Sequence, residues 1–168
     1  MKKIFIITIL MSLIAFSSNA FAQETISIEF ATAIPVASKL STDQRLLLKE
    51  KIEQLLARTN TSGNIESTPF VIVPDIIIET TSVSEGTIYP VTMIQGKLVL
   101  LVKNKYDGTV FNELSINLVN TIKENVHKDA ISLLIDSINI NEPRFVKFIK
   151  ISQKRILERY KDDGIVIP

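Results

Sequence analysis

Basic side chains are concentrated near the end of the chain. Between Arg144 and Lys161 the sequence contains seven basic residues and one acid, Glu158. At 100° per residue, a helix over this segment places four lysines in one stripe, Lys147, Lys150, Lys154 and Lys161, roughly opposite Phe145, Ile149, Ile156 and Tyr160. Such a stripe can contact an anionic membrane surface or an acidic partner, with Lys147, Lys150 and Lys154 as the binding residues. The alternative is a helix that packs on the rest of the domain and whose lysines are simply exposed to solvent.

Two carboxylates could do acid/base chemistry. Asp75 and Glu79 are four residues apart on a predicted strand, so their side chains share a face. A glycosidase holds two carboxyl groups about 5–10 Å apart across a cleft. Nothing in the sequence fixes such a cleft, and acidic side chains facing water along a strand are ordinary. A small carboxylate-dependent hydrolase is therefore the alternative function.

The sequence offers little material for other catalytic sites. His127 is the only histidine. The chain therefore lacks the second histidine that a metal site with two histidine ligands needs, and only this one residue could act as the base of a serine triad. The chain has no cysteine, which excludes thiolate metal sites, cysteine nucleophiles and disulfides. The common glycine-rich, metalloprotease and calcium-loop motifs are absent. We therefore expect no catalytic residue, no cofactor and no metal, and a protein that is not an enzyme.

The first 22 residues have the pattern of a secretory signal peptide. Lys2 and Lys3 precede an apolar run over 4–16, and Ala20-Phe21-Ala22 forms a small-x-small cleavage site. The run is 13 residues long, which is short for a membrane span of about 20 residues. We expect cleavage after Ala22, a periplasmic or secreted bacterial protein, and no transmembrane segment in the mature chain.

The charge balance argues against nucleic acid as a ligand. Removing Lys2 and Lys3 from the 19 basic residues leaves 17, against 18 acidic residues. Binding to a phosphate backbone requires a clear basic excess, which the mature chain lacks. The remaining 146 residues, 23–168, suit a single domain.

Apolar periodicity predicts the regular elements. Strands are expected over 24–31, about 69–79, 91–104 and from Thr109 onward, and helices over 42–58, 124–139 and 143–160. Ser41 and Gln44 form a capping box before the first helix, and Pro143 suits the first position of the last. The β-branched run at 70–78 is typical of a strand covered on both faces, with a bulge or an edge at Pro74. Gly96 suggests a bulge, and Asp107-Gly108 a hairpin turn.

This order, β-α-β-β-β-α-α, predicts an α+β fold. We expect a two-layer sandwich in which a sheet of about four strands, mostly antiparallel, carries the helices on one face.

Several short segments resemble a known group of proteins. They are Leu55-Leu56-Ala57-Arg58-Thr59-Asn60, Pro69-Phe70-Val71-Ile72-Val73-Pro74, Asp107-Gly108-Thr109-Val110-Phe111 and Phe145-Val146-Lys147-Phe148-Ile149. The chain resembles an uncharacterised family of small exported proteins of Gram-negative bacteria, similar in layout to the α/β domain of curli-assembly-type periplasmic lipoproteins. The resemblance implies binding and self-association in envelope assembly or secretion, and it brings no catalytic residues. The chain departs from that pattern at 119–123, where a glycine turn is missing, and in having no lipid-attachment cysteine.

The predicted function is therefore a non-enzymatic binding or assembly module of the bacterial cell envelope. Its partner is expected to be a protein or a second copy, with an anionic membrane surface as a further alternative. Besides the lysine stripe, the sheet edge near Pro74 and the loop over 82–90 are candidate contact regions, because an open edge accepts another strand and loops carry many binding residues.

Overall fold

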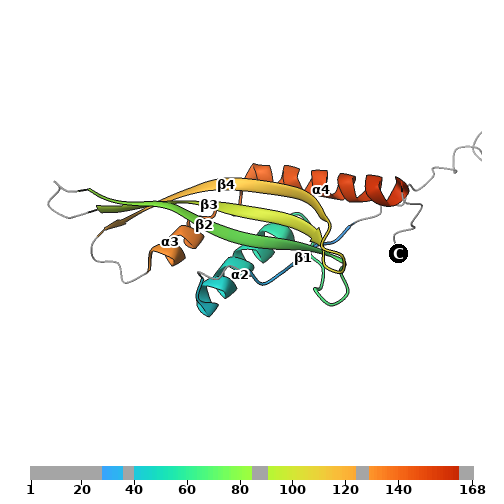
Figure 1. Cartoon of the computed structure of the whole chain (residues 1–168), viewed down its shortest axis with the longest axis horizontal. Helices are drawn as coiled ribbons and strands as arrows, with labels where there is room; N and C mark the ends of the chain where they lie inside the picture. Colours follow the sequence, from blue (N-terminus) through green and yellow to red (C-terminus); the bar gives the residue numbers. More distant parts are fainter. Residues whose placement is uncertain (1–27, 36–39, 85–90, 124–128, 163–168) are drawn as a thin grey trace, which may run out of the picture.

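One mixed sheet and three helices form the described part of the protein. The structure is a computed structural model that describes residues 28–35, 40–84, 91–123 and 129–162. Its elements in chain order are β1 (Ala31–Thr32), α2 (Thr42–Arg58), β2 (Phe70–Ser84), β3 (Val91–Asn104), β4 (Val110–Lys123), α3 (Ala130–Asp136) and α4 (Pro143–Asp162). The strand order is β1-β2-β3-β4, with β1 parallel to β2 and the other neighbours antiparallel (Figure 1). The predicted α+β fold is confirmed.

Helix α2 forms where its capping signals predict. The Ser41 hydroxyl accepts from the Gln44 amide, while the Gln44 side chain accepts from the Ser41 amide at 2.8 Å. The helix ends at Arg58, and Asn60 then adopts a left-handed φ of 53°, which asparagine tolerates better than most residues. Its buried side chains are the four predicted from the apolar spacing, Leu48, Ile52, Leu55 and Leu56.

The three long strands form a meander with a tight turn between β3 and β4. Gly108 has a φ of 75°, and the amide of Thr109 donates to the Asp107 carboxylate at 2.8 Å. This hydrogen bond, with a second from the Thr109 side chain, lowers the pKa of Asp107. The Asp-Gly hairpin predicted at this position is confirmed.

Three predicted segments differ in their bounds. Of the predicted strand over 24–31, residues 24–27 lie outside the described part, and the ladder to β2 involves only Ala31 and Thr32. Of the helix predicted over 124–139, residues 124–128 lie outside the described part, and α3 begins at Ala130 because Asp129 has an extended backbone and acts as its N-cap. The loop predicted from Ser82 is strand through Ser84.

Gly96 allows α3 to pack directly on the sheet. A Cβ at this position would lie 2.5 Å from Leu134 Cδ2 and 2.8 Å from the Ile77 carbonyl oxygen. The bulge expected at Gly96 falls on the neighbouring strand, where the β2–β3 register shifts between Ile78 and Thr80. The glycine therefore marks both a close helix contact and the irregular part of the ladder.

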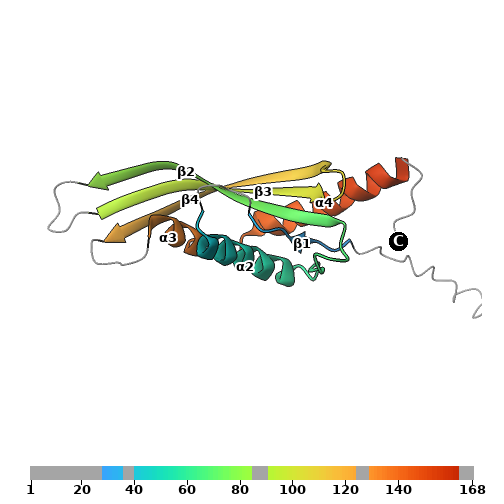
Figure 2. The same cartoon turned by 60° about the horizontal axis from the view of Figure 1, so that its bottom comes forward.

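All three helices lie on one side of the sheet, as Figure 2 shows. Along β3 the even-numbered residues from Ile94 to Asn104 are buried on the helix side, while the odd-numbered ones remain partly exposed. The expectation that β2 is covered on both faces is therefore wrong, because Ile77 keeps 47% of its surface exposed on the other side. No helix within the described residues is both long enough and apolar enough to cross a membrane.

Candidate functional site: a lysine-lined groove on the last helix

The inner side of α4 is anchored by apolar burial. Its side chains toward the sheet are almost fully buried and include Phe145, Phe148, Ile149 and Ile156. Pro143 occupies the first position, and Glu142 just before it accepts from the Arg144 side chain at 2.7 Å and from the Arg144 amide at 3.2 Å. The hydrogen bond from the Arg144 side chain lowers the pKa of Glu142.

A buried polar network fixes the rotation of α4 against β4. Asn112 Nδ2 donates to Ser152 Oγ at 3.1 Å and to the Phe148 carbonyl at 3.2 Å. Its Oδ1 accepts from Arg155 Nη1 at 2.8 Å, and Ser152 Oγ donates to the Phe148 carbonyl at 2.7 Å. Because these groups are satisfied in only one rotation of the helix, the opposite side of α4 must face outward.

The C-terminal part of α4 is held by aromatic contacts. The Tyr160 ring lies 5.8 Å from the Phe70 ring and 6.4 Å from the Phe111 ring, and its hydroxyl accepts from Asn104 Nδ2 at 3.1 Å. Together with the Asn112 network, these contacts attach the helix to the sheet at two separate places.

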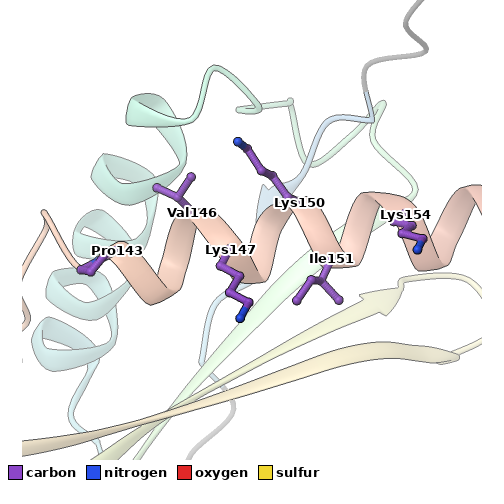
Figure 3. A pocket seen from close by; sticks show the side chains of 6 residues that line it. All are labelled: Pro143, Val146, Lys147, Lys150, Ile151 and Lys154. Atoms are coloured by element: carbon purple, nitrogen blue, oxygen red, sulfur yellow. The ribbon is translucent and has the colours of Figure 1, made fainter.

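The outward side of α4 carries a shallow groove. It has a volume of about 400 Å³, and the described residues that line it all belong to this helix: Pro143, Val146, Lys147, Lys150, Ile151 and Lys154. In Figure 3, Val146 and Lys150 extend from one flank of the helix and Lys147 and Ile151 from the other. The three lysines predicted as binding residues thus line one groove, while Lys161, predicted in the same stripe, is exposed but does not line it.

The positive charge of the groove is only partly neutralised. Lys154 Nζ lies 3.6 Å from Glu158 Oε1, between side chains that are 75% and 58% exposed. Among the described residues, Lys147 and Lys150 have no ion-pair partner. Like charges at i,i+3 and i,i+4 spacing destabilise a helix by about 0.2–0.5 kcal/mol per pair. The clustering of lysines therefore has a small cost to the isolated chain that a bound anion would offset.

The groove also has an apolar component. Val146 is 44% exposed, and Pro143 and Ile151 lie beside the lysine stems. Such a surface suits a ligand that combines negative charge with apolar groups. The lysine ammonium groups pair with the anion, while the three apolar side chains bury apolar area of the ligand. The prediction from the sequence missed Val146 and Ile151, although their spacing already places them on the lysine side of the helix.

The two candidate carboxylates share a face but engage in local contacts. Glu79 Oε1 accepts from Lys97 Nζ at 2.7 Å, and Asp75 Oδ1 accepts from the amide of Ile76 at 2.8 Å. The exposed side chain of Ile77 lies between them in the sequence. Nothing in this arrangement favours a hydrolase. Within the part of the chain that is described, no group of three or more acidic, histidine or cysteine side chains could hold a metal ion.

The other predicted contact regions are only partly described. Pro74 pairs with Leu100 without a register shift, just beyond the two β2 residues that β1 covers. Proline has no amide to donate, which explains why the β1 ladder goes no further and leaves this edge free. Residues 85–90 of the predicted loop, and His127, lie outside the described residues.

Comparisons with known proteins give a distant structural likeness only. No protein-family model matches the chain, and no curated protein is a significant match. A minor lipoprotein from Acinetobacter baumannii is similar in structure with a TM-score of 0.43 and 9% identity, over 80% of this chain and 96% of that one. A protein assigned as a lipoprotein from Caulobacter crescentus has a TM-score of 0.40 and 10% identity, over 77% and 86% of the two chains.

A third solved structure is assigned as a homologue of the neuraminyllactose-binding haemagglutinin from Helicobacter pylori. It has a TM-score of 0.37 and 11% identity, and the likeness covers 82% of this chain and 86% of that one. At these values no function is carried from these three bacterial proteins to the present chain.

Proposed function

We propose that this protein is an exported, non-enzymatic binding module of the bacterial cell envelope that binds an acidic segment of a protein partner through the outward side of α4. The observation that supports this proposal is the groove on α4 where Lys147, Lys150 and Lys154 lie together with the apolar side chains of Pro143, Val146 and Ile151. Export rests on the leader over 1–22, which lies outside the described residues.

An acidic protein segment suits the groove better than a membrane surface does. Each lysine near an anionic bilayer contributes about 1 kcal/mol, so three lysines give about 3 kcal/mol. Exposed ion pairs to an acidic segment contribute about 0.2–1 kcal/mol each, so charge alone does not separate the two ligands. A surface helix would add affinity by inserting its apolar stripe, but in α4 this stripe, including Phe145, Ile149 and Ile156, is buried under the sheet.

The proposal is tested by titrating the mature protein with poly-L-glutamate as a defined acidic probe. The test variant carries Lys147→Gln, Lys150→Gln and Lys154→Gln. Exposed ion pairs contribute about 0.2–1 kcal/mol each, so the three changes should weaken binding about 3- to 100-fold. Binding by the unmodified protein should also weaken as salt is raised, because the lysines are exposed to solvent.

A matched control removes the same charge from another helix. Lys49→Gln, Lys51→Gln and Arg58→Gln on α2 change the net charge equally and should leave the affinity within about twofold, because exposed charges beyond a Debye length of about 8 Å are screened. Equal loss in both triple variants would contradict a specific site on α4. Vesicles containing anionic lipid provide the second arm, and tighter binding to them than to poly-L-glutamate would contradict a protein partner.

A further inference from the structure

The side of the sheet that faces away from the helices is partly apolar. We call it the open face and define it by the cross-strand neighbours on that side, Val73, Asp75, Ile77, Lys97, Val99, Leu101, Lys103, Glu113, Ser115 and Asn117. Its apolar residues lie on β2 and β3, where Val73 pairs with Leu101. On β4 its central residues Glu113, Ser115 and Asn117 are polar and exposed, while Val110 and Val119 are exposed apolar residues nearer the two ends of the strand. An apolar centre with a polar rim is the usual anatomy of a protein interface.

The composition of β2 is that of a strand with cover on both sides. The run from Phe70 to Ile78 is dense in β-branched residues, which is typical of sheets packed on both faces. Among the described residues, however, the helices cover only one face (Figure 2), and Ile77 remains 47% exposed. The described helices of one chain therefore supply no second layer over this part of the sheet.

The charges of the open face suit a surface identical to itself. The face carries two basic residues, Lys97 and Lys103, and two acidic ones, Asp75 and Glu113, while Glu79 at the β2 bulge reaches Lys97. Lys97 and Glu79 already pair at 2.7 Å, whereas Lys103 and Glu113 have no ion-pair partner within the described chain. A nearly balanced set of both signs is self-complementary, as a two-fold interface requires, and it does not favour a strongly charged partner.

The size of the face limits the strength of the contact. The residues that define the face span Lys97 to Lys103 on β3, seven residues or about 24 Å, across three strands about 14 Å wide, or roughly 340 Å² for one copy. Standard interfaces bury about 800 Å² per partner, and weak ones less than about 600 Å². The area of the face therefore corresponds to weak, concentration-dependent association.

We infer that the open face packs against the open face of a second copy of this chain, forming a two-fold dimer with the two sheets face to face. The α4 groove lies on the helix side of each copy, so both grooves stay free in the dimer. This dimer is independent of the proposed anion binding.

Sedimentation equilibrium of the mature chain between about 1 and 500 µM tests the inference. The expected result is a monomer–dimer equilibrium whose dissociation constant rises at least tenfold in Val99→Glu. Because Val99 is half-buried, Ser115→Arg provides a second variant, which adds bulk and charge at an exposed rim position and removes no apolar side chain. Val146→Glu on α4, and the triple lysine variant, should dimerise as the unmodified chain does.

A crosslink provides the geometric test. The chain has no cysteine, so Leu101→Cys creates one unique thiol on the open face. Face-to-face sheets lie about 10 Å apart, so a bismaleimide of about this span should join two copies. The same linker should leave Gln54→Cys, exposed on α2, uncrosslinked. A chain that is monomeric over the whole range, or a dimer unaffected by Val99→Glu and Ser115→Arg, would overturn the inference.

Discussion

Asn112 Nδ2 of β4 donates a hydrogen bond to Ser152 Oγ of α4 across 3.1 Å, and both residues are buried in the interface between helix and sheet. Ser152 interrupts the apolar side of the helix, and Asn112 supplies the matching polar group on the strand. The pair thereby fixes which side of α4 faces the sheet and which side presents the lysines.

Removing this pair should destabilise the protein. Asn112→Ala leaves the buried Ser152 hydroxyl without one of its partners and removes one of the two acceptors of Arg155, so the free energy of unfolding should fall by about 1–3 kcal/mol. Ser152→Ala should have a smaller effect. Chemical denaturation of both single variants and the double variant measures the coupling, expected at about 0.5–3 kcal/mol. Strictly additive effects would show that the two side chains do not act together.

Gly96 should not tolerate a methyl group. Gly96→Ala brings a Cβ to 2.5 Å from Leu134 Cδ2 and 2.8 Å from the Ile77 carbonyl oxygen. Leu134 can shift its side chain, but the Ile77 contact involves backbone, so we expect a loss of about 1–3 kcal/mol. The double variant with Leu134→Ala should remain less stable than Leu134→Ala alone, as thermal unfolding would show. If the double variant were as stable as Leu134→Ala alone, the strain would come only from the contact with the Leu134 side chain.

Asp129 should contribute to acid sensitivity. The Ser132 hydroxyl donates to its carboxylate at 2.6 Å and, with further donors including the Gln44 side chain, lowers the pKa of Asp129. A pKa depressed in the folded state means that unfolding takes up a proton in acid. The stabilising effect of the Asp129 carboxylate is therefore present at pH values above about 3.9, the pKa of aspartate in the unfolded chain, and is lost as the pH falls below that value.

The matched variant for this site is Asp129→Asn, since asparagine is an equally good N-cap without a titrating group. At pH 7 its stability should lie within about 1 kcal/mol of the unmodified protein. Between pH 4 and pH 2 its unfolding free energy should decline less steeply, which denaturant titrations at several pH values measure. Identical slopes would mean that Asp129 is not linked to acid unfolding.

Glu158 should weaken anion binding at the groove. It is the only acidic residue of α4 before Asp162 and lies 3.6 Å from Lys154 Nζ. Glu158→Gln frees Lys154 and removes a nearby negative charge, so affinity for poly-L-glutamate should rise about 1.5- to 5-fold, given about 0.2–1 kcal/mol for an exposed pair. Glu53→Gln on α2, which breaks the Lys49–Glu53 pair, is the control and should leave the affinity unchanged.

Local signals predicted the elements that depend on nearby residues. The capping box at Ser41 and Gln44 defined the start of α2, and Pro143 defined the start of α4. The start of α3 was missed because apolar spacing from Val126 outweighed Asp129, whose carboxylate caps the helix through Ser132. The two-residue length of β1 depends on its partner in β2, and no local pattern reveals it.

The candidate site was predicted in part for a similar reason. The helical spacing of Lys147, Lys150 and Lys154 indicated one outward stripe, and all three are exposed. The groove itself depends on Val146 and Ile151, which lie on the two flanks of the helix beside the lysines once Phe145 and Ile149 are buried. The uncovered face of β2 was also missed, because a β-branched run gives no information on which chain supplies the second layer.

Photo-crosslinking in the native envelope tests the central claim most directly. A photoreactive amino acid at Val146, inside the groove, should join the protein to a discrete partner protein. This adduct should be lost when Lys147, Lys150 and Lys154 are changed to glutamine, and retained when Lys49, Lys51 and Arg58 are changed instead. An adduct equally strong in the groove variant, or crosslinks to lipid alone, would contradict the account.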